Sequence, residues 1–140
     1  MPSDARVEIK NGDVKSTGTM EGDISIGDAK SSYFRADSVH YVNSRLALQV
    51  MGTQGEAEKS TVIAASLRPQ TPSGSYKLGG SEINDLSYYP PRGDLLWTVT
   101  GGGINITFDE DGKRAHGTLQ IFGKHLQQTL EVLVSFDVRN

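Results

Sequence analysis

The sequence predicts an all-β fold, a two-sheet antiparallel β-sandwich of about ten strands, and three observations lead to that prediction. Many segments alternate between apolar and polar residues, the pattern of strands with one buried face. Sixteen Gly and five Pro residues divide these segments at short intervals. Turn dipeptides such as Asp111-Gly112 lie between consecutive alternating segments. A small β-barrel is the alternative architecture, because its strands have the same alternation.

The clearest strand lies near the end of the sequence, where apolar residues occupy every second position from Leu130 to Val138. Four other segments alternate in the same way, so each has one face for a core. These four segments are 46–51, 95–100, 104–108 and 118–121. Weaker strands are predicted at 24–26, 33–35, 39–42, 61–67 and 75–78.

Two segments have a second interpretation. The segment 56–68 has no Gly or Pro and begins with good helix formers, so at most one short helix is predicted there. Thr61, Val62 and Ile63 favour a strand, which we prefer. The three glycines at 101–103 separate two alternating segments and predict either a tight turn or a β-bulge.

Length and composition predict one soluble domain spanning residues 1–140. Residues 1–30 are the most polar stretch and are interpreted as a more mobile N-terminal hairpin or arm. The 14 basic and 17 acidic residues give a net charge of −3, which does not favour nucleic acid or an anionic membrane as a partner. The absence of cysteine removes disulfides and thiolate chemistry.

Two features of the sequence predict the cellular location of the protein. No apolar run is long enough for a membrane span, and the first residues have no leader pattern. We therefore expect a cytoplasmic protein as the sequence is written, or an exported one if a leader has been removed.

The most distinctive local composition is the segment 88–97, which places two Tyr, one Trp, an Arg and an Asp around a rigid Pro-Pro. Exposed aromatic residues on a stiff loop suit ligand binding, because little entropy is lost when they are covered. Tyr88, Tyr89, Arg92 and Asp94 are the predicted ligand-binding residues. Trp97 is assigned to the core, because it shares one face of its predicted strand with Leu95 and Val99.

Asp109 and Asp111 are candidate ligands for calcium, but a solvated hairpin turn is preferred, because Lys113 stands where a third oxygen ligand is needed. No other metal and no cofactor is predicted. The nucleophile and phosphate-binding motifs are absent, which favours a protein that is not an enzyme. The three histidines, His40, His116 and His125, have no metal-ligand spacing in the sequence.

The order of the central segments resembles a known group of proteins. Gly74-Ser75-Tyr76-Lys77-Leu78 is followed by the segments 103–108, 111–114 and 117–122, and Gly, Tyr and alternating apolar residues recur through these motifs taken together. From about residue 46 to 122 the chain is similar to uncharacterised bacterial β-sandwich domains, often exported or lipid-anchored. The resemblance implies a bacterial β-sandwich and provides no catalytic residue.

The preferred function is a non-catalytic binding or interaction module whose loops contact a protein or carbohydrate ligand. A β-barrel carrier of a small apolar ligand and a hydrolase with dispersed acids and histidines are the alternatives. A homo-oligomer is predicted if the final strand lies at a sheet edge, where it can pair with a second copy. Leu133, on the polar face of that strand, suggests a further contact.

Overall fold

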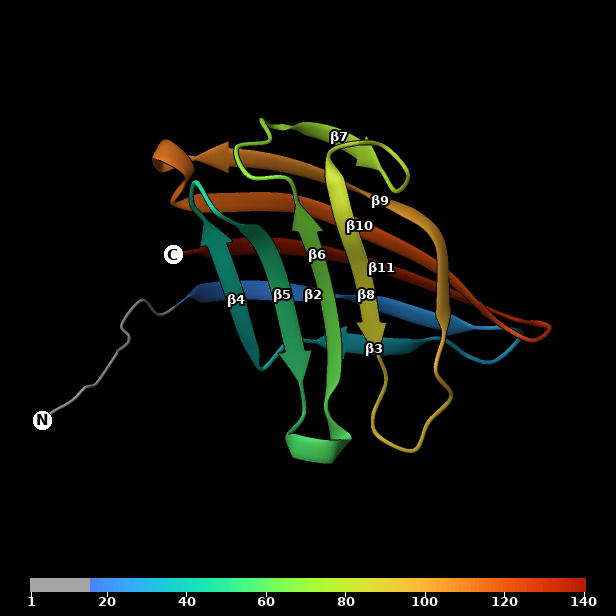
Figure 1. Cartoon of the computed structure of the whole chain (residues 1–140). Helices are drawn as coiled ribbons and strands as arrows, with labels where there is room; N and C mark the ends of the chain where they lie inside the picture. Colours follow the sequence, from blue (N-terminus) through green and yellow to red (C-terminus); the bar gives the residue numbers. More distant parts are fainter. Residues whose placement is uncertain (1–15) are drawn as a thin grey trace, which may run out of the picture.

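A computed structural model describes residues 16–140, which form two antiparallel β-sheets (Figure 1). The larger sheet has the strand order β3-β2-β11-β10-β9-β7, and the smaller has the order β4-β5-β6-β8. The sheets do not close into a barrel, so the sandwich prediction is confirmed and the barrel alternative is wrong. The same result removes the barrel interior on which the prediction of an apolar-ligand carrier depended.

The larger sheet is built from six strands and the smaller from four. Those of the larger sheet are β2 (Thr17–Ile26), β3 (Ser32–Arg35), β7 (Gly74–Lys77), β9 (Thr98–Asp109), β10 (Arg114–His125) and β11 (Gln128–Arg139). Those of the smaller sheet are β4 (Ser38–Asn43), β5 (Leu48–Gln54), β6 (Thr61–Leu67) and β8 (Ile83–Tyr89).

Two single-turn 3-10 helices, Ala57–Lys59 and Glu110–Gly112, are the only helical segments within the described residues. The segment 56–68 is therefore a short turn followed by strand β6, as its β-branched residues predicted. None of the helical segments among residues 16–140 is long and apolar enough to cross a membrane.

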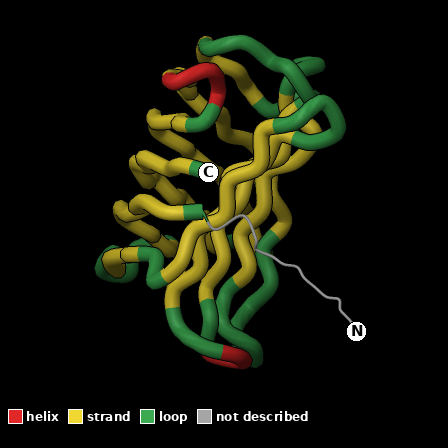
Figure 2. The backbone as a smooth tube through the Cα atoms, turned by 90° about the vertical axis from the view of Figure 1, so that its left-hand side faces the viewer, coloured by secondary structure: helices red, strands yellow, loops and turns green. Residues whose placement is uncertain are grey.

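The two sheets pack face to face with their strands crossing steeply (Figure 1), which is the orthogonal form of sheet packing. Figure 2 shows the two layers from the side. The core lies between them and is built from the apolar residues that occupy every second position of each strand. The opposite face of each sheet has no further layer of described residues over it.

Strand β11 lies in the middle of the larger sheet, paired with β10 on one side and β2 on the other. It is not an edge strand, so the condition on which the predicted pairing with a second copy depended is not met. The edges of the two sheets are β3, β7, β4 and β8. Part of the proposed N-terminal arm, residues 1–15, lies outside the described residues. Its remainder contains β2, which pairs with neighbours on both sides.

The three glycines at 101–103 lie inside one long strand, β9, and do not form a turn. A register shift between β9 and β10 occurs beside them, so the bulge alternative is confirmed. A side chain at Gly102 would bring its Cβ to 2.1 Å from the carbonyl oxygen of Gln120, and its φ of +132° also favours glycine. The strand predicted from residue 95 begins at Thr98, and Leu95 and Leu96 lie in the preceding loop.

Candidate functional site

The predicted site residues lie where β8 ends and the loop to β9, residues 90–97, begins (Figure 1, below the sheets). Consecutive strand residues point to opposite faces, which separates the two tyrosines. Tyr88 is 8% exposed and belongs to the core, whereas Tyr89 is 57% exposed on the outer face. The four predicted residues therefore contribute to two different surfaces.

Tyr88 and Asp94 line the first of these surfaces, a cavity of about 350 Å³ beneath the loop, here called the loop cavity. Apolar and aromatic residues form most of its wall, and Asp94 supplies its one carboxylate. The cavity is lined by Ile26, Tyr88, Pro90, Asp94, Leu95 and Trp97, together with the backbone of Gly93.

Burial, and then the negative charge of Asp94, raise the pKa of the Tyr88 phenol. The phenol therefore stays protonated and available as a hydrogen-bond donor at neutral pH. The loop cavity thus combines a neutral phenol with the carboxyl group of Asp94.

Trp97 lines the loop cavity and packs against the core while only partly buried, so its assignment to the core is confirmed in part, although it lies in the loop before β9. Its ring lies edge-on to the ring of His125 on β10, with centroids 6.2 Å apart and planes at 70°. This contact connects the loop cavity to the end of the larger sheet. Leu95, which lines the cavity, is 48% exposed, and the next residue, Leu96, is 74% exposed, so the surface beside the cavity is apolar.

Tyr89 and Arg92 line a separate groove on the other side of the loop, which also includes Glu58 and Val62. Arg92 Nη1 donates to Glu58 Oε1 at 2.6 Å, and the Arg92 amide donates to the Glu58 carbonyl oxygen at 2.7 Å. These two bonds tie the loop to the short turn between β5 and β6. Arg92 therefore holds the loop against this turn.

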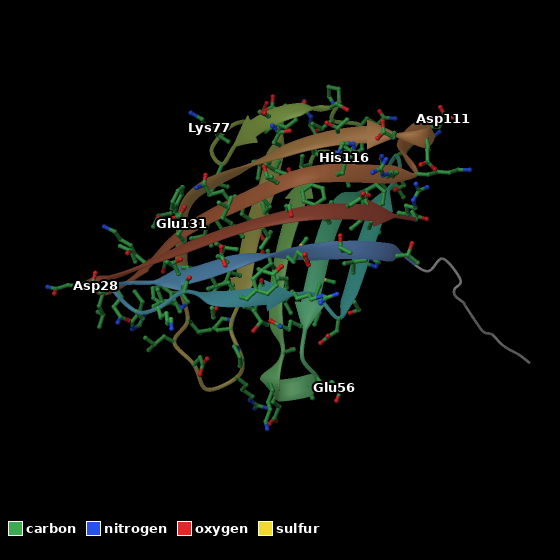
Figure 3. The ribbon with its side chains drawn as sticks, turned by 180° about the vertical axis from the view of Figure 1, so that it is seen from behind. Asp28, Glu56, Lys77, Asp111, His116 and Glu131 are labelled. Carbon is green, nitrogen blue, oxygen red and sulfur yellow. The ribbon has the colours of Figure 1, made fainter. Side chains whose placement is uncertain are left out.

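A third surface, which the sequence did not single out, lies on the outer face of the larger sheet. It is a groove of about 430 Å³, here called the sheet groove, and Figure 3 views this face with Lys77, His116 and Glu131 labelled. The feature of the sequence that could have indicated this groove is the polar residue at every second position of three alternating segments. The side chains and glycine that form it are Ser75, Lys77, Gly103, Asn105, Thr118, Gln120, Phe122 and Leu133.

The weak calcium candidate does not form an open ligand set. Asp109 Oδ2 lies 3.0 Å from His116 Nε2 and 3.5 Å from Arg114 Nη1, so neighbouring side chains already occupy it. Asp111 is exposed in the 3-10 turn after β9. Among residues 16–140, no group of three or more His, Cys, Asp or Glu side chains is arranged to hold a metal ion.

The three histidines do not come together. His40 lies on β4 of the smaller sheet, while His116 and His125 lie nine residues apart on β10, about 30 Å along an extended strand. The contact between His116 and Asp109 is a histidine–carboxylate pair of the kind a hydrolase uses, but it lies on the sheet surface and lines none of the three grooves described above. The hydrolase alternative remains a prediction.

Protein-family models, curated protein sequences and solved structures were compared with this chain, and none matches it. The resemblance over residues 46–122 to bacterial β-sandwich domains therefore remains an expectation. The function has to be inferred from the chemistry of the loop cavity and the sheet groove.

Proposed function

We propose that this protein is a non-catalytic binding module that takes up the lysine side chain of a protein ligand in its loop cavity. The observation that carries the proposal is the presence of Tyr88, Asp94 and Trp97 in the wall of one cavity. The carboxylate attracts an ammonium group, and aromatic rings attract the same charge through their electron-rich faces. The apolar remainder of the wall suits the methylene groups of lysine.

The size of the cavity agrees with a single long side chain. Its volume of about 350 Å³ lies near the lower end of the range for ligand pockets, about 300–1,000 Å³. A whole folded ligand does not fit, so the rest of a protein partner has to lie outside. Leu95, in the wall of the cavity, and its neighbour Leu96 are exposed, so a partner can cover both.

The loop is held in place before any ligand binds. The ion pair and backbone hydrogen bond between Arg92 and Glu58 fix its outer side, and Pro90-Pro91 restrict its first residues. A loop that is already ordered loses little entropy when it binds. Arg92, predicted from the sequence as a ligand contact, therefore serves this proposal as a positioning residue.

The experiment uses Trp97, which is the single tryptophan of the chain and lies in the wall of the cavity. Its fluorescence is titrated with Nα-acetyl-lysine methylamide and, in parallel, with the norleucine analogue, which lacks the ammonium group. We expect a saturable change with the lysine compound at a dissociation constant on the order of 1 mM, about −4 kcal/mol. Equal responses to both compounds, or a response to neither, would contradict the proposal.

Two variants test the role of the carboxylate. Asp94→Asn preserves the shape of the side chain and removes its charge, so we expect it to abolish the lysine response. Asp85→Asn, an exposed aspartate on β8 that does not line the loop cavity, is the matched control and is expected to bind as the native chain does. A loss of binding in both variants would show that the effect is not specific to Asp94.

A further inference from the structure

The geometry points to a second binding site: we infer that the sheet groove binds a neutral oligosaccharide. This site lies on the outer face of the larger sheet and shares no residue with the loop cavity. It is therefore independent of the lysine site proposed above. Its shape, hydrogen-bonding groups and charges each contribute to the assignment of the ligand.

The hollow exists because β9 has a glycine in the middle of the face. Gly103 pairs with Lys77 on β7 and with Gln120 on β10, so no side chain fills the space between those of Lys77 and Gln120. The gap cannot easily be filled, because a Cβ at Gly103 would lie 2.4 Å from the carbonyl oxygen of Tyr76. The groove is a fixed part of the strand geometry.

The floor of the groove presents hydrogen-bonding groups that suit sugar hydroxyls. Asn105, Thr118 and Ser75 are exposed, and the hydrogen bonds among residues 16–140 involve none of these three side chains. Gln120 Nε2 donates to Glu131 Oε2 at 3.0 Å, which orients the amide and leaves its carbonyl oxygen as an acceptor. Amides and hydroxyls both donate and accept, as sugar hydroxyls require.

One wall of the groove is apolar. Phe122 lies on the same face of β10 as Gln120 and is 38% exposed, and Leu133, opposite Gln120 on β11, is 48% exposed. The C–H face of a sugar ring is apolar, so it can pack on an exposed aromatic ring while its hydroxyls reach polar groups at the side. A polar floor beside an apolar wall therefore fits a saccharide better than a wholly apolar ligand.

The charges select a neutral sugar. Among residues 16–140, Lys77 is the one charged side chain that lines the groove. Glu131 lies opposite Phe122, and Asp23 lies opposite Leu133, so carboxylates border the apolar wall. These carboxylates repel acidic glycans and phosphate backbones, and in the described part of the chain the groove has only the single basic residue Lys77 to offset them.

The test is native gel electrophoresis in the presence of dissolved polysaccharides, in which binding slows the migration of the protein. The probes are three neutral polymers, hydroxyethyl cellulose, mannan and barley β-glucan, and one acidic polymer, polygalacturonate. We expect at least one neutral polymer to slow the protein and polygalacturonate not to do so. A protein that migrates unchanged in all three neutral gels, or that is slowed most by polygalacturonate, overturns the inference.

Substitutions locate the binding on the sheet groove. We expect Phe122→Ala and Asn105→Ala each to weaken binding by about tenfold, from lost stacking and lost hydrogen bonds respectively. The matched control is Tyr89→Ala, which removes an exposed aromatic residue from the opposite sheet and is expected to bind normally. If Tyr89→Ala weakens binding as much as Phe122→Ala, the sheet groove is not the site.

Two measurements keep this inference separate from loss of folding and from the loop cavity. The thermal midpoint of each variant shows whether it is folded, and Asn105→Ala, on an exposed side chain, provides the test if Phe122→Ala is unstable. Asp94→Asn is expected to retain polysaccharide binding, and Phe122→Ala to retain the fluorescence response to the lysine compound. The two sites can therefore succeed or fail independently.

Discussion

The hydroxyl of Tyr41, on β4 of the smaller sheet, donates a 2.5 Å hydrogen bond to the carbonyl oxygen of Gly112, in the turn between β9 and β10 of the larger sheet. The tyrosine is 1% exposed, and its burial raises the pKa of the phenol, which therefore remains a donor. Asn43 Nδ2 donates to the Tyr41 hydroxyl at 3.1 Å and to the Gly112 carbonyl oxygen at 3.3 Å. These bonds join the two sheets at one end of the sandwich.

Replacing Tyr41 by Phe removes the hydroxyl and keeps the ring. We expect the free energy of unfolding to fall by about 1–2 kcal/mol, because a buried hydrogen bond is lost. Urea denaturation measures this change. Tyr33→Phe, at a tyrosine that is 58% exposed, is the control, with an expected change within about 0.5 kcal/mol. Equal effects of the two substitutions would exclude a structural role for the bond to Gly112.

Gly117 is a position where only glycine fits. An added Cβ would lie 1.7 Å from the carbonyl oxygen of Asn105 on the neighbouring strand, and the φ is +156°. We expect Gly117→Ala to lower the free energy of unfolding by about 3 kcal/mol or more, because the backbone of β10 has to move. Gly27→Ala is the control, because nothing lies within 4 Å of its added Cβ. Its expected cost is about 1–2 kcal/mol, from the positive φ alone.

Asp137 gives the stability a dependence on acidic pH. The guanidinium of Arg114 donates to both of its carboxylate oxygens, at 2.9 and 2.7 Å, and this pairing lowers the pKa of Asp137. The carboxylate of Asp137 therefore stays ionised in the folded state at a pH where the same carboxylate is already protonated in the unfolded chain. The stabilisation is complete when the pH lies above the pKa of Asp137 in the unfolded chain. It is lost as the pH falls through the lowered pKa that Asp137 has in the folded state.

The measurement is the free energy of unfolding between about pH 5 and pH 2, in the native chain and in Asp137→Asn. We expect the decline with acidification to be shallower in the variant. Asp28→Asn, at an exposed turn residue, should leave the slope as it is in the native chain. A variant of Asp137 with the native slope would show that the pair with Arg114 makes no net contribution.

The ion pair between Arg92 and Glu58 positions the loop and contributes little to overall stability. Both side chains are largely exposed, at 75% and 70%, so solvent weakens their attraction. We expect Arg92→Ala to change the free energy of unfolding by less than about 0.5 kcal/mol. Backbone amide exchange in residues 90–97 should instead become faster, and hydrogen exchange measures this directly. Unchanged exchange in the loop would contradict the positioning role.

Calcium is expected to leave the thermal midpoint of the protein unchanged. Asp109 is already in contact with His116 and Arg114, so a cation would have to displace both. Thermal unfolding with and without about 5 mM calcium tests this, a concentration that would saturate most extracellular calcium modules. A saturable rise in the midpoint that disappears in Asp111→Asn would establish a site at this turn.

The strands could be predicted from the sequence because their pattern is local. Leu130 to Val138 alternate with a period of two, and such a stretch buries one face in whatever sheet it joins. Which strands become neighbours is not local: β11 pairs with β2, and no residue in either strand specifies that partner. The sequence therefore left open whether β11 lies at an edge, and the structure places it inside the sheet. The start of β9 was misplaced because Leu95 alternates like a strand residue but lies in a loop.

The candidate sites were predictable only where their residues lie close together in the sequence. Tyr88 and Asp94 lie within seven residues of each other in the sequence, so their composition could be noticed and the loop cavity contains both. The period-two rule already implied that Tyr89 would point away from Tyr88. The sheet groove depends on the register between β7, β9 and β10, which sets Asn105 beside Ser75 and Thr118. The periodicity of the sequence does not specify that register, so the sheet groove could not be predicted from it.

The central position of β11 also constrains when this protein can acquire its structure during synthesis. The residues that β2 and β11 pair are more than a hundred positions apart, and β11 is the last of the strands to leave the ribosome. Before β11 emerges, β2 has only the four-residue strand β3 beside it, and β10 has only β9. At that stage of synthesis the strands of the larger sheet form two incomplete halves with exposed edges. Such edges can pair with other nascent chains. The final dozen strand residues close this interval by joining the two halves.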